Sequence, residues 1–353
     1  MSEPLQAVPP EFGQAFAELG LARGPLRGRP LVGGVSSDIW YVEADGAALC
    51  AKRALPTLRV AAEWHAPIER NRYEARYMAV AQQAVPGSVP ALRGQHAALG
   101  VLVMAWLDPA AHPLWKAQLR DGQADAATAA AVGDTLARIH AYTAARPELA
   151  AQFDTDAIFF DIRLEPYLLA TAARHPDLAD VLRGLVAQTQ AHKLALVHGD
   201  VSPKNILVGA QGPVLLDAEC AWWGDPAFDL AFCLNHLLLK CLWTPAARDG
   251  FGRCFDALAA AYLHRVDWEA PAALEARAAA LLPGLLLARV DGKSPVEYLG
   301  TDEQRAPVRR CARALLAAQR GSTADAASSP PARRPAHSTL AAVRAAWFDE
   351  IAR

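Results

Sequence analysis

The second half of the chain contains one short β-structured segment among residues with helical spacing. Two apolar runs, 206–208 and 214–216, flank a loop over 209–213 that contains two glycines and a proline. Apolar β-type runs separated by such turn residues favour an antiparallel hairpin. The segment 194–219 is therefore predicted to be a β island between helices, and any function of the chain is to be sought first around it.

Polar residues stand at the open end of this hairpin. Asn205 immediately precedes the first strand and Asp217 immediately follows the second. Because paired strands lie about 5 Å apart, we expect the amide oxygen and the carboxylate to converge on one point. Asp200 lies on the loop that leads into the hairpin, and Glu219 lies two residues beyond Asp217.

These side chains suit phosphoryl transfer. Oxygen ligands from an asparagine and an aspartate suit Mg²⁺, which completes its shell with water and phosphate oxygens. A separate aspartate, Asp200, can then accept the proton of a substrate hydroxyl. The spacing from Asp200 to Asn205 is also that of a kinase catalytic loop. For any one residue alone we would favour an ordinary loop or turn-capping role, but not for the whole set.

The segment resembles the aminoglycoside phosphotransferase/choline kinase family, which has a protein-kinase-like fold. Three motifs carry the resemblance: His198-Gly199-Asp200-x₄-Asn205, Leu215-Leu216-Asp217-x-Glu219 and Gly224-Asp225-Pro226-Ala227-Phe228-Asp229-Leu230-Ala231. The resemblance covers roughly residues 25–300 and is strongest over 195–235. It implies a bilobal α+β fold, with a small β-rich nucleotide-binding lobe over 1–107 and a larger helical lobe, holding the catalytic loop and acceptor site, over 108–320.

The resemblance also implies roles by position. Asp200 would be the catalytic base, or the residue that orients the acceptor hydroxyl, and Asn205 and Asp217 would hold Mg²⁺. Asp229 would be structural and accept hydrogen bonds from the backbone of the catalytic loop. Glu219 would lie behind the metal ligands or face the substrate. His140 and His198 would be structural supports of the same loop.

The N-terminal part agrees with a nucleotide-binding lobe. A hairpin is predicted over 31–54 around the turn at Asp45-Gly46. Just before and at its start lies a loop of small residues able to approach phosphate closely: Gly33, Gly34, Ser36 and Ser37. An ordinary glycine-rich turn would look the same, and the loop departs from the G-x-G-x-x-G pattern. The nucleotide is therefore left open between ATP and GTP.

Lys52 resembles the kinase lysine that contacts the α- and β-phosphates, and it is predicted to end a strand over 48–51. Its acidic partner is expected on the helix predicted over 69–83, where Glu74 is favoured over the rivals Glu69 and Glu63. The apolar run 100–106 is predicted to be a buried strand. Its end, with Met104 and Trp106, would be the linker whose backbone meets the adenine.

The acceptor site is less well marked. Three groups of polar residues are candidates, although each fits a surface or capping role equally well: Asp161 and Arg163; Asn235 and His236; Arg289, Asp291 and Lys293. Residues 230–320 hold 12 Lys and Arg against 9 Asp and Glu, a balance of +3. This balance argues against a polycationic aminoglycoside and permits a sugar, an amino alcohol or a phosphorylated metabolite.

Composition excludes several other classes. A net charge of −2 lacks the basic excess of a dedicated nucleic-acid binder. No apolar run approaches 18 residues and no signal peptide is visible at the N-terminus, so we expect a cytoplasmic protein without a membrane partner. The 6 cysteines form no C-x-x-C pair, which makes a zinc site unexpected.

We therefore expect a kinase that uses Mg²⁺ and ATP, with GTP as the other candidate, to phosphorylate a hydroxyl of a small molecule. The main alternative is a nucleotide-binding pseudokinase with a regulatory role, against which the intact set Lys52, Asp200, Asn205 and Asp217 argues. A metal-dependent hydrolase is a second alternative. A protein acceptor is a third, but the segment 218–224 is short for an activation segment.

The C-terminal part adds two expectations. Residues 321–338 are rich in Ser, Pro and Ala and are predicted to be a flexible linker. Residues 339–353 are predicted to form an amphipathic helix whose apolar stripe can pack on the chain's own body or on a partner. The oligomeric state is left open.

Overall fold

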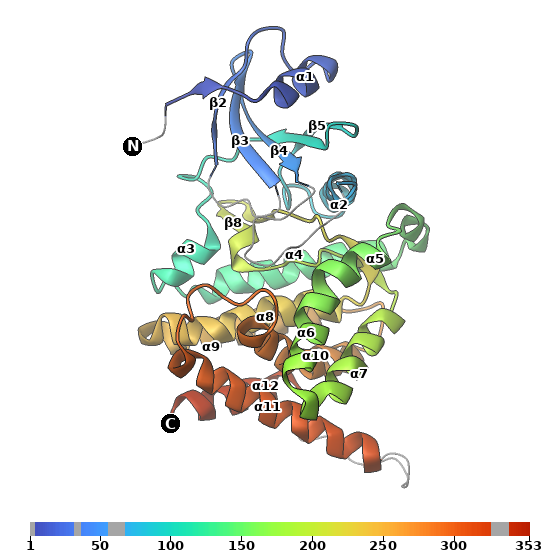
Figure 1. Cartoon of the computed structure of the whole chain (residues 1–353), viewed down its shortest axis with the longest axis vertical. Coiled ribbons are helices and arrows are strands. Elements are labelled where there is room, and N and C mark those ends of the chain that lie inside the picture. Colours follow the sequence, from blue (N-terminus) through green and yellow to red (C-terminus); the bar gives the residue numbers. More distant parts are fainter. Residues whose placement is uncertain (1–3, 32–36, 56–67, 326–338) are drawn as a thin grey trace.

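The computed structural model describes residues 4–31, 37–55, 68–325 and 339–353, and of residues 321–325 the backbone alone. A sheet-rich lobe stands above a larger helical lobe (Figure 1). The α+β class and the two-lobed arrangement expected from the sequence are thus confirmed. Gly33, Gly34, Ser36 and Glu63 lie outside the described residues, as does the segment 326–338.

The upper lobe is built on a six-stranded antiparallel sheet in the order β1-β2-β3-β4-β6-β5. Its strands are β1 (Gln6–Ala7), β2 (Arg27–Pro30), β3 (Ser37–Ala44), β4 (Ala47–Ala54), β5 (Leu92–His96) and β6 (Val101–Ala105). The β3–β4 hairpin turns at Asp45 and Gly46 with φ of 46° and 82°, the paired positive values that a two-residue hairpin turn requires. The sequence did not predict β1, β2 or β5, because these strands are short or largely polar.

Two helices cover the two faces of this sheet. α1 (Pro10–Glu18) buries Phe12 and Phe16 against Val101 and Val103 of β6. α2 (Arg70–Ala84) lies between the sheet and the helical lobe, on the side of Leu102 and Met104. Side chains alternate between the faces of a strand, so β6 needs apolar residues on both faces. This explains the uninterrupted apolar run seen in the sequence.

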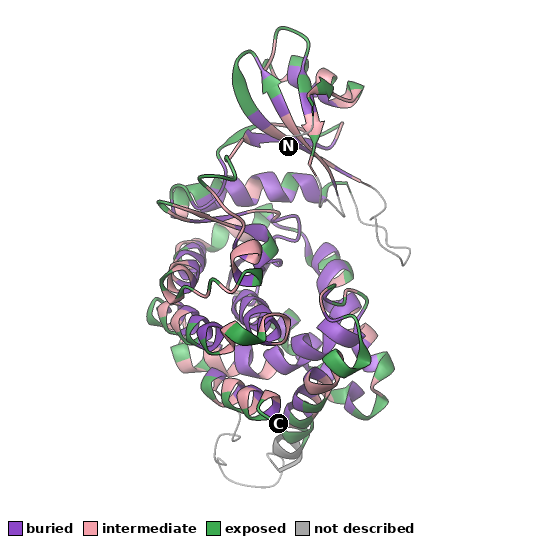
Figure 2. Cartoon of the chain, turned by 90° about the vertical axis from the view of Figure 1, so that its left-hand side faces the viewer, coloured by how far each residue is buried: buried purple, intermediate pink, exposed green. Residues whose placement is uncertain are grey.

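The lower lobe is helical, and its core is formed by long helices that pack across one another (Figures 1 and 2). Its main helices are α3 (Trp115–Arg120), α4 (Ala126–Ala144), α5 (Asp156–Phe159), α6 (Ala170–Arg174), α7 (Ala179–Ala191), α8 (Ala227–Trp243), α9 (Arg248–His264), α10 (Pro271–Asp291), α11 (Asp302–Asp325) and α12 (Leu340–Ile351). Between α5 and α6 the chain forms a π-helix, η2 (Phe160–Leu169), with Pro166 inside it. α11 runs to Asp325, into the segment predicted to be a linker.

α10 is the one helix among the described residues that is long and apolar enough to cross a membrane by length and composition. However, 67% of this stretch is buried inside the protein. It packs against α8, α11 and η2. A helix surrounded on all sides by other helices is apolar all round, so its place in the core accounts for its composition.

The β island lies between the lobes as two small antiparallel pairs. β7 (Ala195–Val197) pairs with β10 (Trp222–Gly224), and β8 (Ile206–Gly209) pairs with β9 (Gly212–Leu215) as predicted. The backbone N–H of Leu216 donates to the carbonyl of Asn205 over 2.8 Å. Leu216 therefore lies opposite Asn205, and Asp217 lies one residue beyond the position expected for it.

α12 packs on the chain's own helical lobe. It buries Leu340, Val343 and Trp347 against a surface to which α9, α10 and α11 contribute. Thr339 caps its N-terminus by accepting from the N–H of Ala342. Of the two possibilities left open by the sequence, the apolar stripe meets its own body.

Candidate active site

A cavity of about 630 Å³ lies between the two lobes. Its upper wall includes Lys52 and Glu74, and its lower wall includes Asp200, Asn205 and Asp217. Met104 and Trp106 line it together with apolar residues from both lobes: Leu31, Ile39, Leu107, Leu207 and Leu215. The fold thus gathers into one space residues that are distant in the sequence, with an apolar side and a charged side.

Lys52 is buried inside β4, not at the end of a strand as predicted, because β4 continues to Ala54. Its Nζ lies 2.9 Å from Oε2 of Glu74, the partner expected on the helix, and it also donates to the carboxylate of Asp217. Burial disfavours the ammonium, but Asp217 and Glu74 outweigh burial and hold the pKa of Lys52 well above its ordinary value.

The two carboxylates around Lys52 differ in their surroundings. Burial raises the pKa of Glu74 to about 7, with Lys52 opposing that rise. Burial also disfavours the Asp217 carboxylate, but Lys52 and Lys204 hold its pKa below the ordinary value. The backbone of Asp217 has a φ of 67°, in the left-handed region that aspartate tolerates better than most residues. This turn carries the chain away from the hairpin directly after Leu216.

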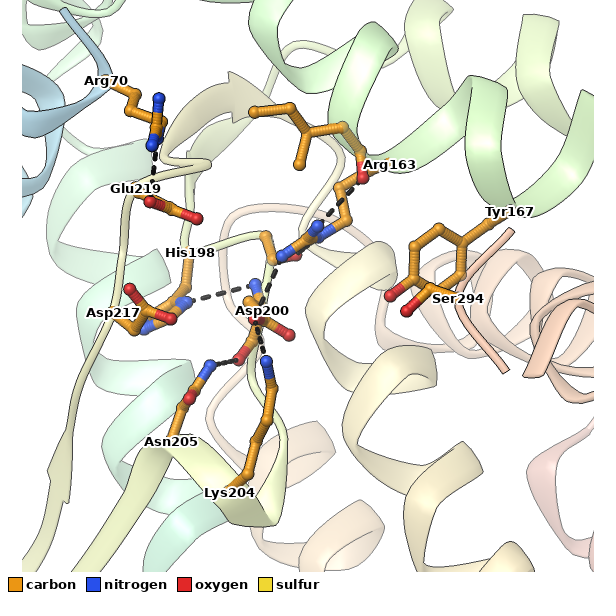
Figure 3. Close-up of polar contacts among 12 residues, drawn as sticks. Arg70, Arg163, Tyr167, His198, Asp200, Lys204, Asn205, Asp217, Glu219 and Ser294 are labelled. Atoms are coloured by element: carbon orange, nitrogen blue, oxygen red, sulfur yellow. Dashed lines mark hydrogen bonds and ion pairs between the residues drawn. The ribbon is translucent and has the colours of Figure 1, made fainter. Parts of the chain in front are cut away.

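Asp200 is held by two cations at the floor of the cavity (Figure 3). Its Oδ2 lies 3.1 Å from Nη2 of Arg163 and 3.2 Å from Nζ of Lys204. Burial would raise the pKa of this carboxyl, but Lys204 and Arg163 outweigh it and the pKa lies below its ordinary value. Asp200 is therefore ionised at neutral pH. Arg163 also donates to the carbonyls of Gly199 and Ile162, so it ties the loop to the π-helix.

A buried aspartate supports this loop from below. Asp229 accepts from the N–H of His198 over 2.7 Å and from the N–H of Gly199 over 2.8 Å. His140 bonds to the same carboxylate at 3.3 Å and to the hydroxyl of Tyr262 at 2.7 Å. Nδ1 of His198 accepts from the N–H of Asp200. These contacts are the structural supports that the resemblance implied.

Oxygen donors for a cation are present on both sides of the hairpin. Nδ2 of Asn205 donates to the backbone carbonyl of Asp200 over 3.1 Å, which fixes the amide, and no donor among the described residues bonds its Oδ1. Asp217 offers the carboxylate. No group of three His, Cys, Asp or Glu that could hold a metal exists among the described residues. An amide and a carboxylate nevertheless fit Mg²⁺, which takes few protein ligands.

Glu219 lines the cavity and is paired with α2. Its Oε2 accepts from Nε of Arg70 over 3.0 Å, and Arg70 also donates to the carbonyl of Leu55 over 2.7 Å. Glu219, two residues after Asp217, thus links the segment that follows the hairpin to α2 of the upper lobe.

The structure separates the acceptor candidates. Arg163 lines the cavity, whereas Asp161 is exposed outside it. Asn235 and His236 are buried in α8 and do not line the cavity. The three remaining candidates do not line the cavity themselves. Arg289 bonds to Tyr167 and Ser294, Asp291 holds Arg309 and His175, and Lys293 pairs with Glu165.

Sequence analysis missed several residues that line the cavity: Lys116, Tyr167, Lys204 and Ser294. Lys204 lies in the catalytic loop itself, so its position beside Asn205 was a signal that the motif contained. The other three come from α3, η2 and the loop after α10. No local pattern marks them, because only the packing of these elements brings them together.

Similar structures agree with the architecture. An ethanolamine kinase from Plasmodium vivax has a TM-score of 0.53 at 12% identity, over 82% of this chain and 83% of that chain. A choline kinase from Cryptosporidium parvum has a TM-score of 0.51 at 11% identity, over 83% of this chain and 90% of that chain. At such identities the similarity shows the fold alone, which is protein-kinase-like.

The sequence profile of the phosphotransferase enzyme family matches residues 27–274, and the chain belongs to that family. Similar curated proteins include methylthioribose kinases from Cronobacter sakazakii, 26% identical over 226 residues, and Erwinia tasmaniensis, 28% identical over 220 residues. These alignments cover 56% and 54% of this chain, and 55% and 53% of the relatives. The chain thus spans about half the length of the curated relatives that it matches.

Proposed function

We propose that this protein is an Mg²⁺-dependent kinase that transfers the γ-phosphoryl group of ATP to a hydroxyl of a small molecule. The observation that carries the proposal is the meeting of two charged systems in one cavity. Lys52 joins Glu74 and Asp217 on one side, and Asp200 is held by Arg163 and Lys204 on the other. Family membership and the methylthioribose kinases among the relatives support a phosphotransferase with a sugar-like acceptor.

Each residue has a role that its position supports. Lys52, steadied by Glu74, would bind the phosphates, and the apolar wall at Met104 and Trp106 would receive the base of the nucleotide. Gly33, Gly34 and Ser36 remain predicted phosphate-binding residues outside the described part. Ser37 is buried with its hydroxyl unbonded among the described residues, and it does not line the cavity.

Asn205 and Asp217 would hold Mg²⁺ through the amide oxygen and the carboxylate. When bound, this ion would neutralise charge on the phosphate groups of the nucleotide. Asp217 already offers a carboxylate ionised at neutral pH, and the bond from Asn205 to the carbonyl of Asp200 fixes the direction of its oxygen.

Asp200 would accept a hydrogen bond from the acceptor hydroxyl and take its proton as the phosphoryl group moves. A loose transition state for phosphoryl transfer demands little basicity and much positioning. The two cations on Asp200 lower its basicity, but they fix its carboxylate, and the bonds from Asp229 to the loop backbone fix the loop itself. The arrangement therefore suits Asp200 to positioning the acceptor hydroxyl more than to acting as a strong base.

The test is acceptor-dependent ADP release from Mg–ATP over a library of hydroxyl metabolites. Asp200→Asn keeps the shape of the side chain and should lower kcat by roughly 10³-fold, since it removes the proton acceptor. Nucleotide binding, followed by the quenching of tryptophan fluorescence, should survive. Asp161→Asn is the matched control, because Asp161 lies outside the cavity, and it should leave turnover unchanged.

Three results would contradict the proposal. Normal turnover in Asp200→Asn would remove Asp200 from the mechanism. Phosphate release without any acceptor would favour a hydrolase, and nucleotide binding without any turnover across the library would favour the pseudokinase alternative.

A further inference from the structure

The cavity continues past Asp200 to an end whose charges are basic. Lys116 and Lys204 line this end, together with Tyr167 and Ser294. Figure 3 shows Tyr167 and Ser294 side by side, on the side of Asp200 away from Asp217. The acids that line the cavity, within the described ranges, are Glu74, Asp200, Asp217 and Glu219, and each already has a cationic partner at the catalytic end.

Arg289 stands directly behind Tyr167 and Ser294. Its Nη1 donates to the Tyr167 hydroxyl over 3.1 Å, to Oγ of Ser294 over 3.0 Å and to the Ser294 carbonyl. Its Nε is buried with no hydrogen-bond partner in the described part of the chain. No carboxylate of the described residues forms an ion pair with Arg289, although 92% of the residue's surface is covered.

Lys240 is a second buried cation without a carboxylate partner among the described residues, and it lies farther from the cavity. It is almost fully buried, and its Nζ lies 4.0 Å from the ring centroids of both Trp243 and Tyr298. Among the described residues it has no carboxylate within ion-pair distance, and the Tyr298 hydroxyl beside it is buried without a partner. Burial lowers the pKa of Lys240 to about 7, and Lys116 adds to that lowering.

We call Lys116, Lys204, Lys240 and Arg289 the basic cluster. All four lie close enough to His236 to act on its charge. Burial and these four cations together hold the pKa of His236 well below its ordinary value. Two members of the cluster have acidic partners: Lys116 pairs with Glu297, which is largely exposed, over 2.5 Å, and Lys204 pairs with Asp200 over 3.2 Å. Arg289 and Lys240 have no carboxylate partner among the described residues, so the cluster keeps an excess of positive charge.

Buried cations without counter-charges cost stability, because they lose their hydration and receive no ion pair in return. An anionic group at this end of the cavity would supply the missing counter-charge. A cationic amine would meet like charge there, and the carboxylates it needs are engaged at the catalytic end. The geometry thus favours acceptors that carry an anionic group away from the reacting hydroxyl and disfavours those that carry a cationic group there.

We infer that the acceptor carries an anionic group, a phosphate or a carboxylate, that binds at the basic cluster while its hydroxyl faces Asp200. Ser294 and Tyr167 would offer their hydroxyls to the same group. This inference rests on the proposed kinase function and adds the chemical class of its substrate.

The test compares matched probes in the full-length protein, saturated with Mg²⁺ and a non-hydrolysable ATP analogue so that the nucleotide phosphate site is filled. The pairs are ribose 5-phosphate with ribose, and glycerate with glycerol, and ethanolamine is the cationic probe. Isothermal titration should show that the anionic member of at least one pair binds at least ~10-fold tighter than its neutral partner. Turnover with ATP should show the same order in kcat/KM.

Variants identify the site. Arg289→Met and, for the more exposed side of the cluster, Lys116→Met should each reduce the anionic preference about 10-fold with nucleotide binding unchanged. Lys293→Met is the matched control, because Lys293 is a nearby exposed lysine outside the cavity with its own acid partner, Glu165. It should keep the full preference.

The outcomes separate the two proposals. Better binding of a neutral or cationic probe, no binding of any anionic probe, or an anionic preference that survives both cluster variants would overturn the inference. Asp200-dependent phosphorylation of a neutral or cationic acceptor in the same assays would leave the kinase function standing without it.

Discussion

One lysine is buried at the catalytic end of the cavity and another is buried behind its basic end, and their surroundings affect them in opposite ways. Lys52 is 4% exposed and Lys240 is 1% exposed. Lys52 has the carboxylates of Glu74 and Asp217, and its pKa is raised. Lys240 has two aromatic rings and no carboxylate of the described residues, and its pKa falls to about 7. Burial is alike at the two sites, so the neighbours decide the charge.

The difference indicates what each end lacks. The catalytic end balances its charges among its own side chains, so these side chains hold one another in place. The basic end keeps an electrostatic cost that a ligand of opposite charge would remove. Binding energy is therefore available at the basic end, and positioning is already present at the catalytic end.

The largest effect on stability is expected at the catalytic end. Lys52→Met would leave the buried Glu74 and the partly buried Asp217 without their cation, and loss of one partner from a buried ion pair costs about 3–5 kcal/mol. Urea unfolding should show this loss in the free energy of unfolding. Arg53→Met is the control on the next residue, because Arg53 pairs with Glu11 near the surface, and it should cost about 1 kcal/mol or less. A change in Lys52→Met as small as the control would contradict the comparison.

The opposite sign is expected at the basic end. The folded pKa of Lys240, about 7, lies below the ordinary 10.5 of the unfolded chain. Between these two pH values the unfolded chain binds more protons than the folded protein does. The free energy of unfolding should therefore rise as the pH rises from 7 towards 10.5. Lys240→Met should remove this slope and stabilise the protein by on the order of 2 kcal/mol at pH 7.

Thermal unfolding of Lys240→Met and the parent protein between pH 6 and 10 would measure this effect. The two curves should approach each other at high pH. Lys293→Met should follow the parent curve closely. A Lys240→Met variant that is less stable than the parent at pH 7 would mean that Lys240 has a counter-charge after all.

The smallest effect is expected where the two ends meet. Arg163 pairs with Asp200, and its guanidinium also lies over the ring of Tyr167, the residue that Arg289 bonds. Arg163→Met should lower kcat about 10-fold, which corresponds to ~1.4 kcal/mol in the barrier. Because Arg163 helps to lower the pKa of Asp200, the acid limb of the kcat profile should also move to higher pH.

Arg163→Lys keeps the charge and should move that acid limb less than Arg163→Met does. An acid limb that stays in place in both variants would show that Arg163 supports the loop only as a structural residue. Nucleotide affinity should be unchanged in both variants.

Much of the catalytic end was predictable because local patterns encode it. Turn residues between apolar runs predicted the β8–β9 hairpin. The helical spacing after residue 69 predicted the helix that carries Glu74, and the kinase resemblance favoured Glu74 as the partner of Lys52. The errors were small shifts at boundaries. β4 extends past Lys52, the left-handed backbone of Asp217 follows Leu216, and α11 continues to Asp325. Packing and hydrogen bonds across strands decide such boundaries.

The patterns of the sequence determined the β3–β4 and β8–β9 hairpins, the helix that carries Glu74 and the place of Asp200 beside the second hairpin, since these depend on periodicity and on turn chemistry between near neighbours. The two-lobed α+β fold followed from the family resemblance of the motifs around Asp200. Only the tertiary structure decided which charges meet. Arg163 reaches Asp200 from a π-helix, and Arg289 and Lys240 lie behind the cavity's far end on separate helices. Whether a charge is paired depends on residues that are far away in the chain. Sequence patterns describe near neighbours and do not show which distant residues meet in space.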